Sequence, residues 1–357
     1  MPSLRYRCVL LALLLAVAGC RPSPPSASEA ALATHAEHPV RVLPLQGPLA
    51  RPAAEISGLA WYNDWLILLP QFPRTAFTAS EGRLYAIARD RIERTLADAT
   101  APPITPRPIP LMAPGLDAHT PTFQGFEAIA FAGDRMYVLV EATSDDAMRS
   151  YLLRGRMAAD LREARLDAPT AQRVPMTTDL PNMSAEALFI QHDTVAVLHE
   201  ANGQNVHPRP QSLLFDRQLR ALGTRPFPTM EYRITDATAP DSAGRFWAIN
   251  YFFPGERDVL QPGPDSLAIR FGTAPSPRRS AVVERLVAFR STPGGVARAD
   301  TPPIRLQLGA EGAGRNWEGL ARLGDRGFLL ATDRFPRTML AFVPRPATNP
   351  PAAATDR

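Results

Sequence analysis

The sequence contains no lysine, so each of its 39 basic residues is an arginine. This absence excludes catalysis through a lysine Schiff base and phosphate binding through a P-loop lysine. The chain has only two cysteines, Cys8 and Cys20. Both lie at the N-terminus, so we expect no disulfide and no thiol chemistry in the remainder of the chain. No basic segment is interleaved with aromatic residues, so nucleic-acid binding is not expected.

The first twenty residues have the pattern of an export signal. Arg5 and Arg7 precede an uncharged apolar run over Val9–Val17, which is too short to span a bilayer but suits the core of a signal peptide. The run ends in Val-Ala-Gly-Cys20, which resembles the bacterial lipobox, whose cysteine carries diacylglycerol. The alternative is an ordinary signal peptide followed by a chance cysteine. We expect removal of residues 1–19 and lipidation of Cys20, with palmitate in the anchor.

The composition beyond Cys20 predicts three further segments. Residues 20–39 are rich in proline, serine and alanine, which favours a flexible tether. Residues 40–344 are expected to fold as one domain, and residues 345–357 to form a disordered tail. Arg21 follows the cysteine, and by resemblance to Gram-negative lipoproteins the lack of aspartate there favours the outer membrane. The predicted location is the cell envelope, anchored to the membrane through lipid and facing the periplasm.

Five segments of the chain repeat one pattern. Each opens with a hydroxyl or carboxylate residue, continues with glycine or alanine and a short strand, and then has a polar turn, a second strand and another polar residue. The segments are Ser57–Gln71, Glu127–Glu141, Glu186–Glu200, Asp236–Asn250 and Glu318–Asp333. The fifth segment is one residue longer, and Gly327 accounts for the extra residue.

Further strands complete each repeat. Third strands are predicted at 83–89, 150–156, 212–218, 285–290 and 338–343, and weaker fourth strands at 104–112, 173–177, 225–230 and 304–308. Four antiparallel strands per repeat are typical of a propeller blade. The sequence therefore predicts an all-β, five-bladed β-propeller, in which the N-terminal segment 40–46 supplies the missing strand of the fifth blade and closes the ring. A six-bladed propeller is the alternative, because the interval between Asp236 and Glu318 is long.

The repeated polar residues are predicted to form two rings at one end of the central channel. The first residue of strand one and the last residue of strand two lie at the same end of an antiparallel hairpin. The predicted inner ring is Ser57, Glu127, Glu186, Asp236 and Glu318. The predicted outer ring is Gln71, Glu141, Glu200, Asn250 and Asp333. The glycine or alanine after each inner residue allows the strands to crowd near the axis.

The inner ring predicts a cation. Four carboxylates around one axis repel one another unless they are protonated or a cation neutralises them. Calcium fits best, because it accepts six to eight oxygen ligands in flexible geometry, whereas magnesium requires a strict octahedron and zinc prefers histidine or cysteine. We therefore expect one axial Ca²⁺ held by the inner ring. The alternative is that these side chains cap strand ends and bind neighbouring backbone amides.

These openings resemble those of known propellers. The matching tripeptides are Ser57-Gly58-Leu59, Glu127-Ala128-Ile129, Glu186-Ala187-Leu188 and Glu318-Gly319-Leu320, while Asp236-Ala237-Thr238 matches less well. They are similar to the openings in the SdiA-regulated family of exported bacterial proteins, in the soluble calcium-activated nucleotidases (apyrases) and in esterase-like phytase-type propellers. The resemblance implies five blades and, as in the apyrases, one axial calcium ion.

Two arginines and two glutamates are candidates for chemistry at this end. Phe72-Pro73-Arg74-Thr75 and Phe335-Pro336-Arg337-Thr338 are near copies, so Arg74 and Arg337 could bind an anion together with Gln71, Asn250 and Asp333. The alternative is that a chain so rich in arginine places some arginines there by chance. Glu141 and Glu200 are the candidate general bases.

The predicted calcium ring and the candidate residues around it lead to two hypotheses of function. The first is an exported calcium-binding lipoprotein that binds a ligand or partner at the acidic channel mouth. The alternative is a calcium-dependent hydrolase of a phosphoester or another anionic small molecule, of the nucleotidase or esterase-like type, with a metal-bound water as nucleophile. The sequence leaves open whether the protein is an enzyme.

Overall fold

The computed structural model describes residues 36–52, 54–73, 82–144 and 147–346. The predicted signal peptide, the lipidation site Cys20, most of the predicted tether and Arg74 lie outside these residues. In the described part, no helix is both long and apolar enough to cross a membrane.

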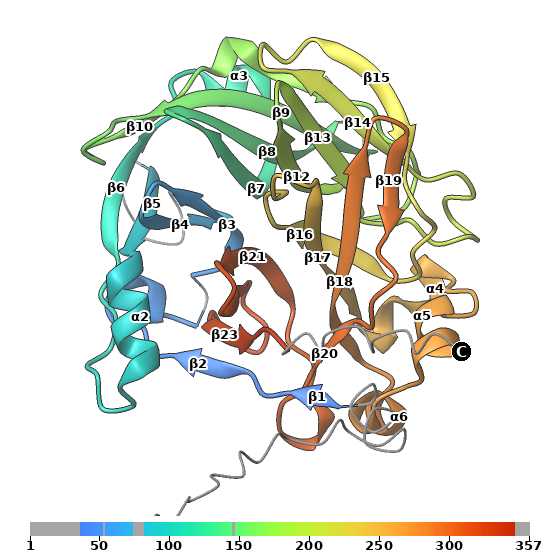
Figure 1. Ribbon diagram of the computed structural model, residues 1–357. Helices are drawn as coiled ribbons and strands as arrows, with labels where there is room; N and C mark the ends of the chain where they lie inside the picture. The colour runs from blue at the N-terminus through green and yellow to red at the C-terminus, as the bar shows by residue number, and fades with distance from the viewer. Residues whose placement is uncertain (1–35, 53, 74–81, 145–146, 347–357) are drawn as a thin grey trace, which may run out of the picture.

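The strands form five blades around one axis, as predicted (Figure 1). Blade one contains β3 (Ile56–Tyr62), β4 (Trp65–Pro70), β5 (Gly82–Ala88) and β6 (Arg107–Met112). Blade two contains β7 (Phe123–Ala132), β8 (Arg135–Ser144), β9 (Ala147–Met157), β10 (Ala164–Leu166) and β11 (Gln172–Val174). Blade three contains β12 (Ala185–Gln191), β13 (Thr194–His199), β14 (Gln211–Asp216) and β15 (Ala221–Pro226).

The last two blades complete the ring. Blade four contains β16 (Arg233–Ala237), β17 (Arg245–Phe252), β18 (Val283–Thr292), β19 (Gly295–Arg298) and β20 (Ile304–Leu306). Blade five contains β21 (Trp317–Leu323), β22 (Gly327–Thr332), β23 (Leu340–Pro344) and the N-terminal strand β2 (Arg41–Leu43). The innermost strands β3, β7, β12, β16 and β21 contact one another in that order and β21 contacts β3, so the propeller has five blades and not six.

The N-terminal strand closes the ring, as predicted. Strand β2 pairs antiparallel with β23, with Val42 opposite Ala341. The predicted tether ends too late, because Glu37–His38 forms β1, which pairs parallel with β20. The carboxylate of Glu37 accepts hydrogen bonds of 2.7 Å from both the backbone N–H and the hydroxyl of Ser276, which attaches this segment to blade four.

One predicted strand is displaced along the chain. The fourth strand of blade three is β15, whereas the sequence predicts residues 225–230. The apolar residues Phe227 and Met230 suggest that later position, but they are buried in the core beyond the strand. Strand β15 itself is mostly exposed, including Leu222, so it lacks the alternation of apolar and polar residues that marks a half-buried strand.

Short helices lie in the connections between strands, mostly between strands of the same blade. They are α2 (Arg89–Ala97), α3 (Leu116–His119), α4 (Arg257–Leu260), α5 (Ser266–Phe271) and α6 (Pro275–Ser280). Single 3₁₀ turns lie at Pro48–Ala50, Ala168–Thr170, Pro254–Glu256 and Ala310–Gly312. Helices α4, α5 and α6 and the turn Pro254–Glu256 lie between β17 and β18. They account for the long interval between Asp236 and Glu318, so this interval does not contain a sixth blade.

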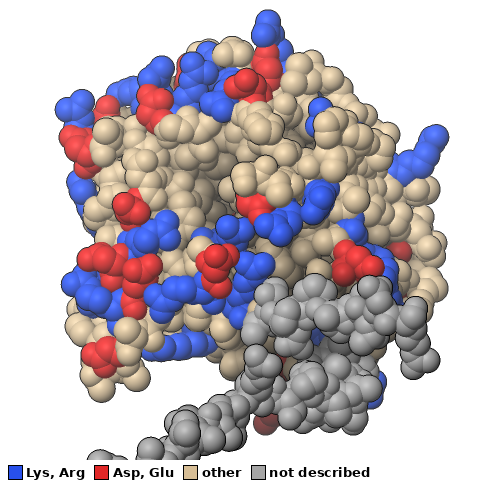
Figure 2. Space-filling view, viewed as in Figure 1, with Lys and Arg blue, Asp and Glu red and all other residues tan. Residues whose placement is uncertain are grey.

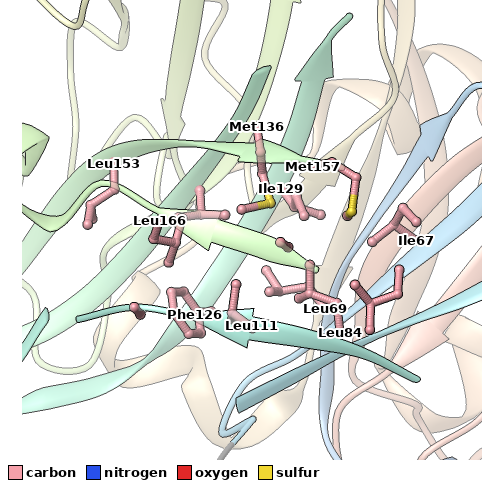
Figure 3. Packing of buried hydrophobic residues seen from close by; sticks show 14 of the residues in the cluster. Ile67, Leu69, Leu84, Leu111, Phe126, Ile129, Met136, Leu153, Met157 and Leu166 are labelled. Carbon is pink, nitrogen blue, oxygen red and sulfur yellow. The ribbon is translucent and has the colours of Figure 1, made fainter. Parts of the chain in front are cut away.

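The core lies between the faces of adjacent blades. Figure 3 shows side chains of blade one, such as Ile67 and Leu84, packed against Phe126, Met136 and Leu153 of blade two. Because a middle strand is covered on both faces by neighbouring blades, its apolar residues form a continuous run rather than alternating with polar ones; all six residues of β22 are buried.

Two glycines near the axis allow the inner strands to approach. A Cβ atom at Gly58 would lie 3.3 Å from the backbone of Ala128 in the next blade, and one at Gly319 would lie 2.8 Å from the Leu59 side chain. The predicted crowding near the axis therefore applies to blades one, two and five.

Candidate functional site

A cavity of about 570 Å³ opens at the end of the channel where the repeats begin and end. We call it the mouth. Its lining carries seven carboxyl groups, those of Glu55, Glu127, Glu141, Glu186, Glu256, Glu318 and Asp333. It also carries two guanidinium groups, Arg233 and Arg334, and four aromatic rings, Phe72, Tyr251, Phe253 and Phe335. The described lining therefore has a large excess of acidic over basic side chains.

A β-bulge in the first strand of each blade presents the inner-ring residue. In each blade the pairing register of strand one with strand two shifts at the inner-ring position, where the unpaired residues are Ser57, Glu127, Glu186, Thr235 with Asp236, and Glu318. Blade two has a second shift, at Gln124. A bulge inserts an extra residue into one strand and re-aims its side chain. The repeat in the sequence is thus a repeat of five bulges at one end of the channel.

Two inner-ring side chains connect neighbouring blades instead of lining the mouth. Ser57 donates a hydrogen bond of 2.5 Å to the carbonyl of Phe126. Asp236 accepts hydrogen bonds from the backbone N–H groups of Ala237, at 2.7 Å, and Leu320, at 2.6 Å. Ser57 and Asp236 therefore bind backbone groups, which is the alternative to calcium binding given by the sequence. Glu127, Glu186 and Glu318 do line the mouth.

Arg233 lies in the middle of the carboxyl groups. It is the first residue of β16, and its side chain is 9 % exposed. One terminal nitrogen donates to both oxygens of Glu186, at 2.9 and 3.1 Å, and Nε donates to Glu200 at 2.5 Å. The other terminal nitrogen lies 3.1 Å from Glu256. This guanidinium therefore supplies positive charge beside Glu186, one of the residues predicted to bind calcium.

Asn316 links a second group of carboxyls to this centre. Its amide nitrogen donates to Glu318 at 2.5 Å and to Asp333 at 2.9 Å, and its oxygen lies 3.5 Å from a nitrogen of Arg233. The second oxygen of Glu318 is buried and has no hydrogen-bond partner in the described structure. A buried carboxylate oxygen without a partner is costly, which favours the protonated acid at Glu318.

The predicted outer ring divides into residues that line the mouth and residues that lie behind it. Gln71, Glu141 and Asp333 line the mouth. Glu200 and Asn250 are fully buried behind it. Glu200 accepts from the backbone N–H of Ser184 at 2.7 Å and from Arg233, so a role as the base that meets substrate does not suit it. Asn250 accepts from Arg285 at 2.8 Å and donates to two backbone carbonyls, so it supports blade four.

Burial and mutual repulsion raise the pKa of several carboxyl groups of the mouth. Burial, followed by the charge of Glu200, raises the pKa of Glu141 to about 7. Burial and the charges of Glu141 and Glu318 hold the pKa of Glu127 well above its ordinary value. Burial also raises the pKa of Glu186, and there the charge of Arg233 opposes the shift. One guanidinium cannot neutralise all of these groups, so several of them hold protons near neutral pH.

The predicted anion-binding pair of arginines is not assembled in the described residues. Arg337 is exposed and does not line the mouth, and Arg74 lies outside the described residues. The mouth instead contains Arg334, whose guanidinium lies 3.9 Å from Glu55.

Sequence reasoning missed Arg233, Glu55, Glu256 and Asn316. Glu55 lies two residues before the inner-ring residue Ser57, and Asn316 lies two residues before Glu318. A polar residue at this position is visible in the sequence and could have identified both. Glu256 lies in the insertion after β17 and gave no such signal.

Comparisons with known proteins match this chain in structure but not in sequence. No protein-family model matches the chain, and no curated protein matches it in sequence. A glycoside hydrolase of the GH130 family of mannoside phosphorylases, which targets β-1,2 mannosidic linkages in Candida mannan, aligns with 88 % of this chain and 96 % of its own at a TM-score of 0.49 and 9 % identity.

Two further solved structures are similar. A β-fructofuranosidase from Bombyx mori covers 90 % of this chain and 69 % of its own, with a TM-score of 0.46 and 11 % identity. A glycosyl hydrolase from Bacteroides ovatus covers 84 % of this chain and 87 % of its own, with a TM-score of 0.45 and 11 % identity. At these identities the likeness concerns the fold alone.

The function expected from the sequence is corrected. The three solved structures described above are named for enzymes that cleave glycosidic bonds, and none of the three is named as a calcium-binding lipoprotein or a phosphoesterase. The lining of the mouth has seven carboxyl groups and only two guanidinium groups, which disfavours the anionic small molecule predicted as a possible ligand and as the substrate of the hydrolase. Among the described residues, no group of three or more histidine, cysteine, aspartate or glutamate side chains is arranged to hold a metal ion. Binding of calcium stays a prediction.

Proposed function

We propose that the protein is a hydrolase that cleaves a glycosidic bond of a neutral carbohydrate in the mouth. The observation that carries this proposal is the presence, in one cavity, of a carboxyl group with a pKa of about 7, Glu141, and a carboxylate bound by an arginine, Glu186. Glycoside hydrolysis uses two carboxyl groups in different protonation states.

The two groups suit different halves of the reaction. Glu141 keeps its proton near neutral pH and can pass it to the glycosidic oxygen as the C–O bond breaks. Glu186 accepts two hydrogen bonds from Arg233, whose positive charge opposes the rise in its pKa that burial causes. In its ionised form Glu186 can stabilise positive charge on the sugar ring and accept a proton from the attacking water. Water supplies the hydroxyl that ends on the sugar, and the proton taken from it balances the one that Glu141 donates.

The remainder of the lining suits a neutral sugar. Carboxylates, Gln71, Gln124 and Asn182 offer hydrogen-bond partners to hydroxyl groups, and an uncharged substrate avoids the repulsion that an anion would meet. Phe72, Phe253 and Phe335 give the mouth apolar surface on which the carbon faces of sugar rings can pack, and Phe253 and Phe335 are largely exposed.

The proposal is tested by measuring sugar release from a panel of neutral α- and β-linked glycosides across a pH series. We expect Glu141→Gln and Glu186→Gln each to lower kcat by about 10²–10⁴-fold. Activity of the unaltered enzyme should fall as pH rises through about 7, where Glu141 loses its proton. Glu93→Gln, on α2 and outside the mouth, is the matched control.

Two outcomes would contradict the proposal. One is hydrolysis that is unchanged in both mouth variants. The other is the absence of sugar release from every glycoside in the panel by protein that is shown to be folded. Two features predicted from sequence stay predictions beside this proposal: membership of the SdiA-regulated, apyrase or phytase-type propellers, and a lipid anchor at Cys20 in the cell envelope.

A further inference from the structure

Blade two carries a group of arginines on its outer part, away from the mouth. Arg135 on β8, Arg156 on β9 and Arg165 on β10 line one cavity of about 430 Å³, together with Arg154 and Asp167. In Figure 1 strand β10 lies at the upper left, and Figure 2 shows basic and acidic side chains gathered along that edge of the molecule.

The strand register places three of these arginines in one row. Arg135 is directly opposite Arg156 in the β8–β9 pair, and Arg156 is directly opposite Arg165 in the β9–β10 pair. Residues directly opposite each other in a sheet project from the same face. Arg154 is two residues before Arg156 in β9, so it also projects from this face. Four guanidinium groups therefore share one patch.

The acidic groups around the patch do not balance it. Asp134 pairs with Arg156 at 2.5 Å, and Asp167 lies 3.8 Å from Arg154. Four guanidinium groups against these two carboxylates leave two positive charges. Like charges directly opposite in a sheet destabilise it, and no described contact of the fold explains why three arginines occupy this row.

We propose that this patch binds a phosphate group. A phosphate monoester carries about two negative charges near neutral pH and several acceptor oxygens. It therefore matches both the excess charge and the planar donor fork of arginine, which binds phosphate through two parallel hydrogen bonds. A single carboxylate would leave one charge unmatched. The site is separate from the mouth, and this proposal does not depend on glycoside hydrolysis.

Binding of inorganic phosphate and of pyrophosphate, measured by calorimetry at low and high salt, tests the site. We expect the double variant Arg135→Gln/Arg165→Gln to bind at least about tenfold more weakly, and added salt to weaken binding by the unaltered protein. The matched control is Arg94→Gln/Arg220→Gln. It removes two exposed arginines that are each paired with an acid four residues earlier, and so changes the net charge equally.

A second measurement separates two sources of the phosphate. Co-sedimentation with phosphatidylcholine vesicles, with and without phosphatidic acid, detects a lipid headgroup. Retention that needs phosphatidic acid and is lost in the patch variant supports a lipid source, whereas binding of the soluble phosphates alone supports a soluble ligand. Equal binding by the patch variant and the control variant would overturn the proposal, and so would no detectable binding of any of these probes by folded protein. The melting temperature of each variant confirms folding, and we expect the patch variant to melt no lower than the control.

Discussion

Replacing Arg233 is the sharpest test of how the mouth is held together. Arg233→Met keeps a long unbranched side chain but removes the charge shared by Glu186, Glu200 and Glu256. Breaking one buried ion pair by removing a single partner costs about 3–5 kcal/mol. Because three carboxylates lose the same partner here, we expect a loss of at least about 4 kcal/mol in the free energy of unfolding near neutral pH.

The dependence of this loss on pH is the diagnostic feature. Without Arg233 the pKa values of Glu186 and Glu200, already raised in the folded protein, rise further. A carboxyl group whose pKa is higher in the folded state stabilises the protein fully below its unfolded pKa, and that contribution is lost as pH rises through the folded pKa. The variant should therefore lose more stability than the unaltered protein as pH rises from about 5 to about 8.

Denaturant unfolding over this pH range measures the effect. Each additional proton held by the folded variant makes the stability fall more steeply by about 1.4 kcal/mol per pH unit. Arg315→Met is the matched control, since Arg315 is also buried but has one carboxylate partner, Glu284, at 2.7 Å. We expect a steeper slope for the Arg233 variant than for the Arg315 variant. Equal slopes, or a loss near neutral pH below about 1 kcal/mol, would refute the idea that Arg233 neutralises several carboxyls at once.

Two further predictions concern the ring. Gly58→Val should lower stability by about 1–3 kcal/mol, because its Cβ would lie 3.3 Å from the backbone of Ala128, which cannot move aside as a flexible side chain can; an unchanged melting temperature would contradict the close approach of blades one and two. Removing all residues before Pro44 deletes β1 and β2, so we expect a clearly lower melting temperature, whereas removing residues 1–35 should leave it unchanged. Equal melting of the two truncated proteins would show that β2 does not close the ring.

The repeat made much of the fold predictable from sequence. Five openings such as Glu127-Ala128 and Glu318-Gly319 recur with nearly constant spacing to a second polar residue, and a hairpin of that length has only one way to place both ends together. The number of blades, the closing strand Arg41–Leu43 and the end of the channel where polar residues gather all follow from this local pattern.

The calcium ring and its expected anionic ligand illustrate the limit of the same reasoning. The repeated pattern predicts the same role for all five opening residues. In the structure, however, Ser57 and Asp236 bind the backbone of neighbouring blades, while Glu127, Glu186 and Glu318 line the mouth. Which of these occurs depends on the direction of each bulged side chain, and equal spacing does not reveal that direction.

The sequence by itself therefore determined the blades, because their strands and turns are local patterns repeated along the chain. Only the tertiary structure decided the chemistry of the mouth. Arg233 and Glu186 are 47 positions apart, and Arg233 and Asn316 are 83 positions apart, so the packing of adjacent blades around the axis brings them together. Burial in that closed ring then raises the pKa of Glu141 to about 7, a property that no single segment of the chain has alone.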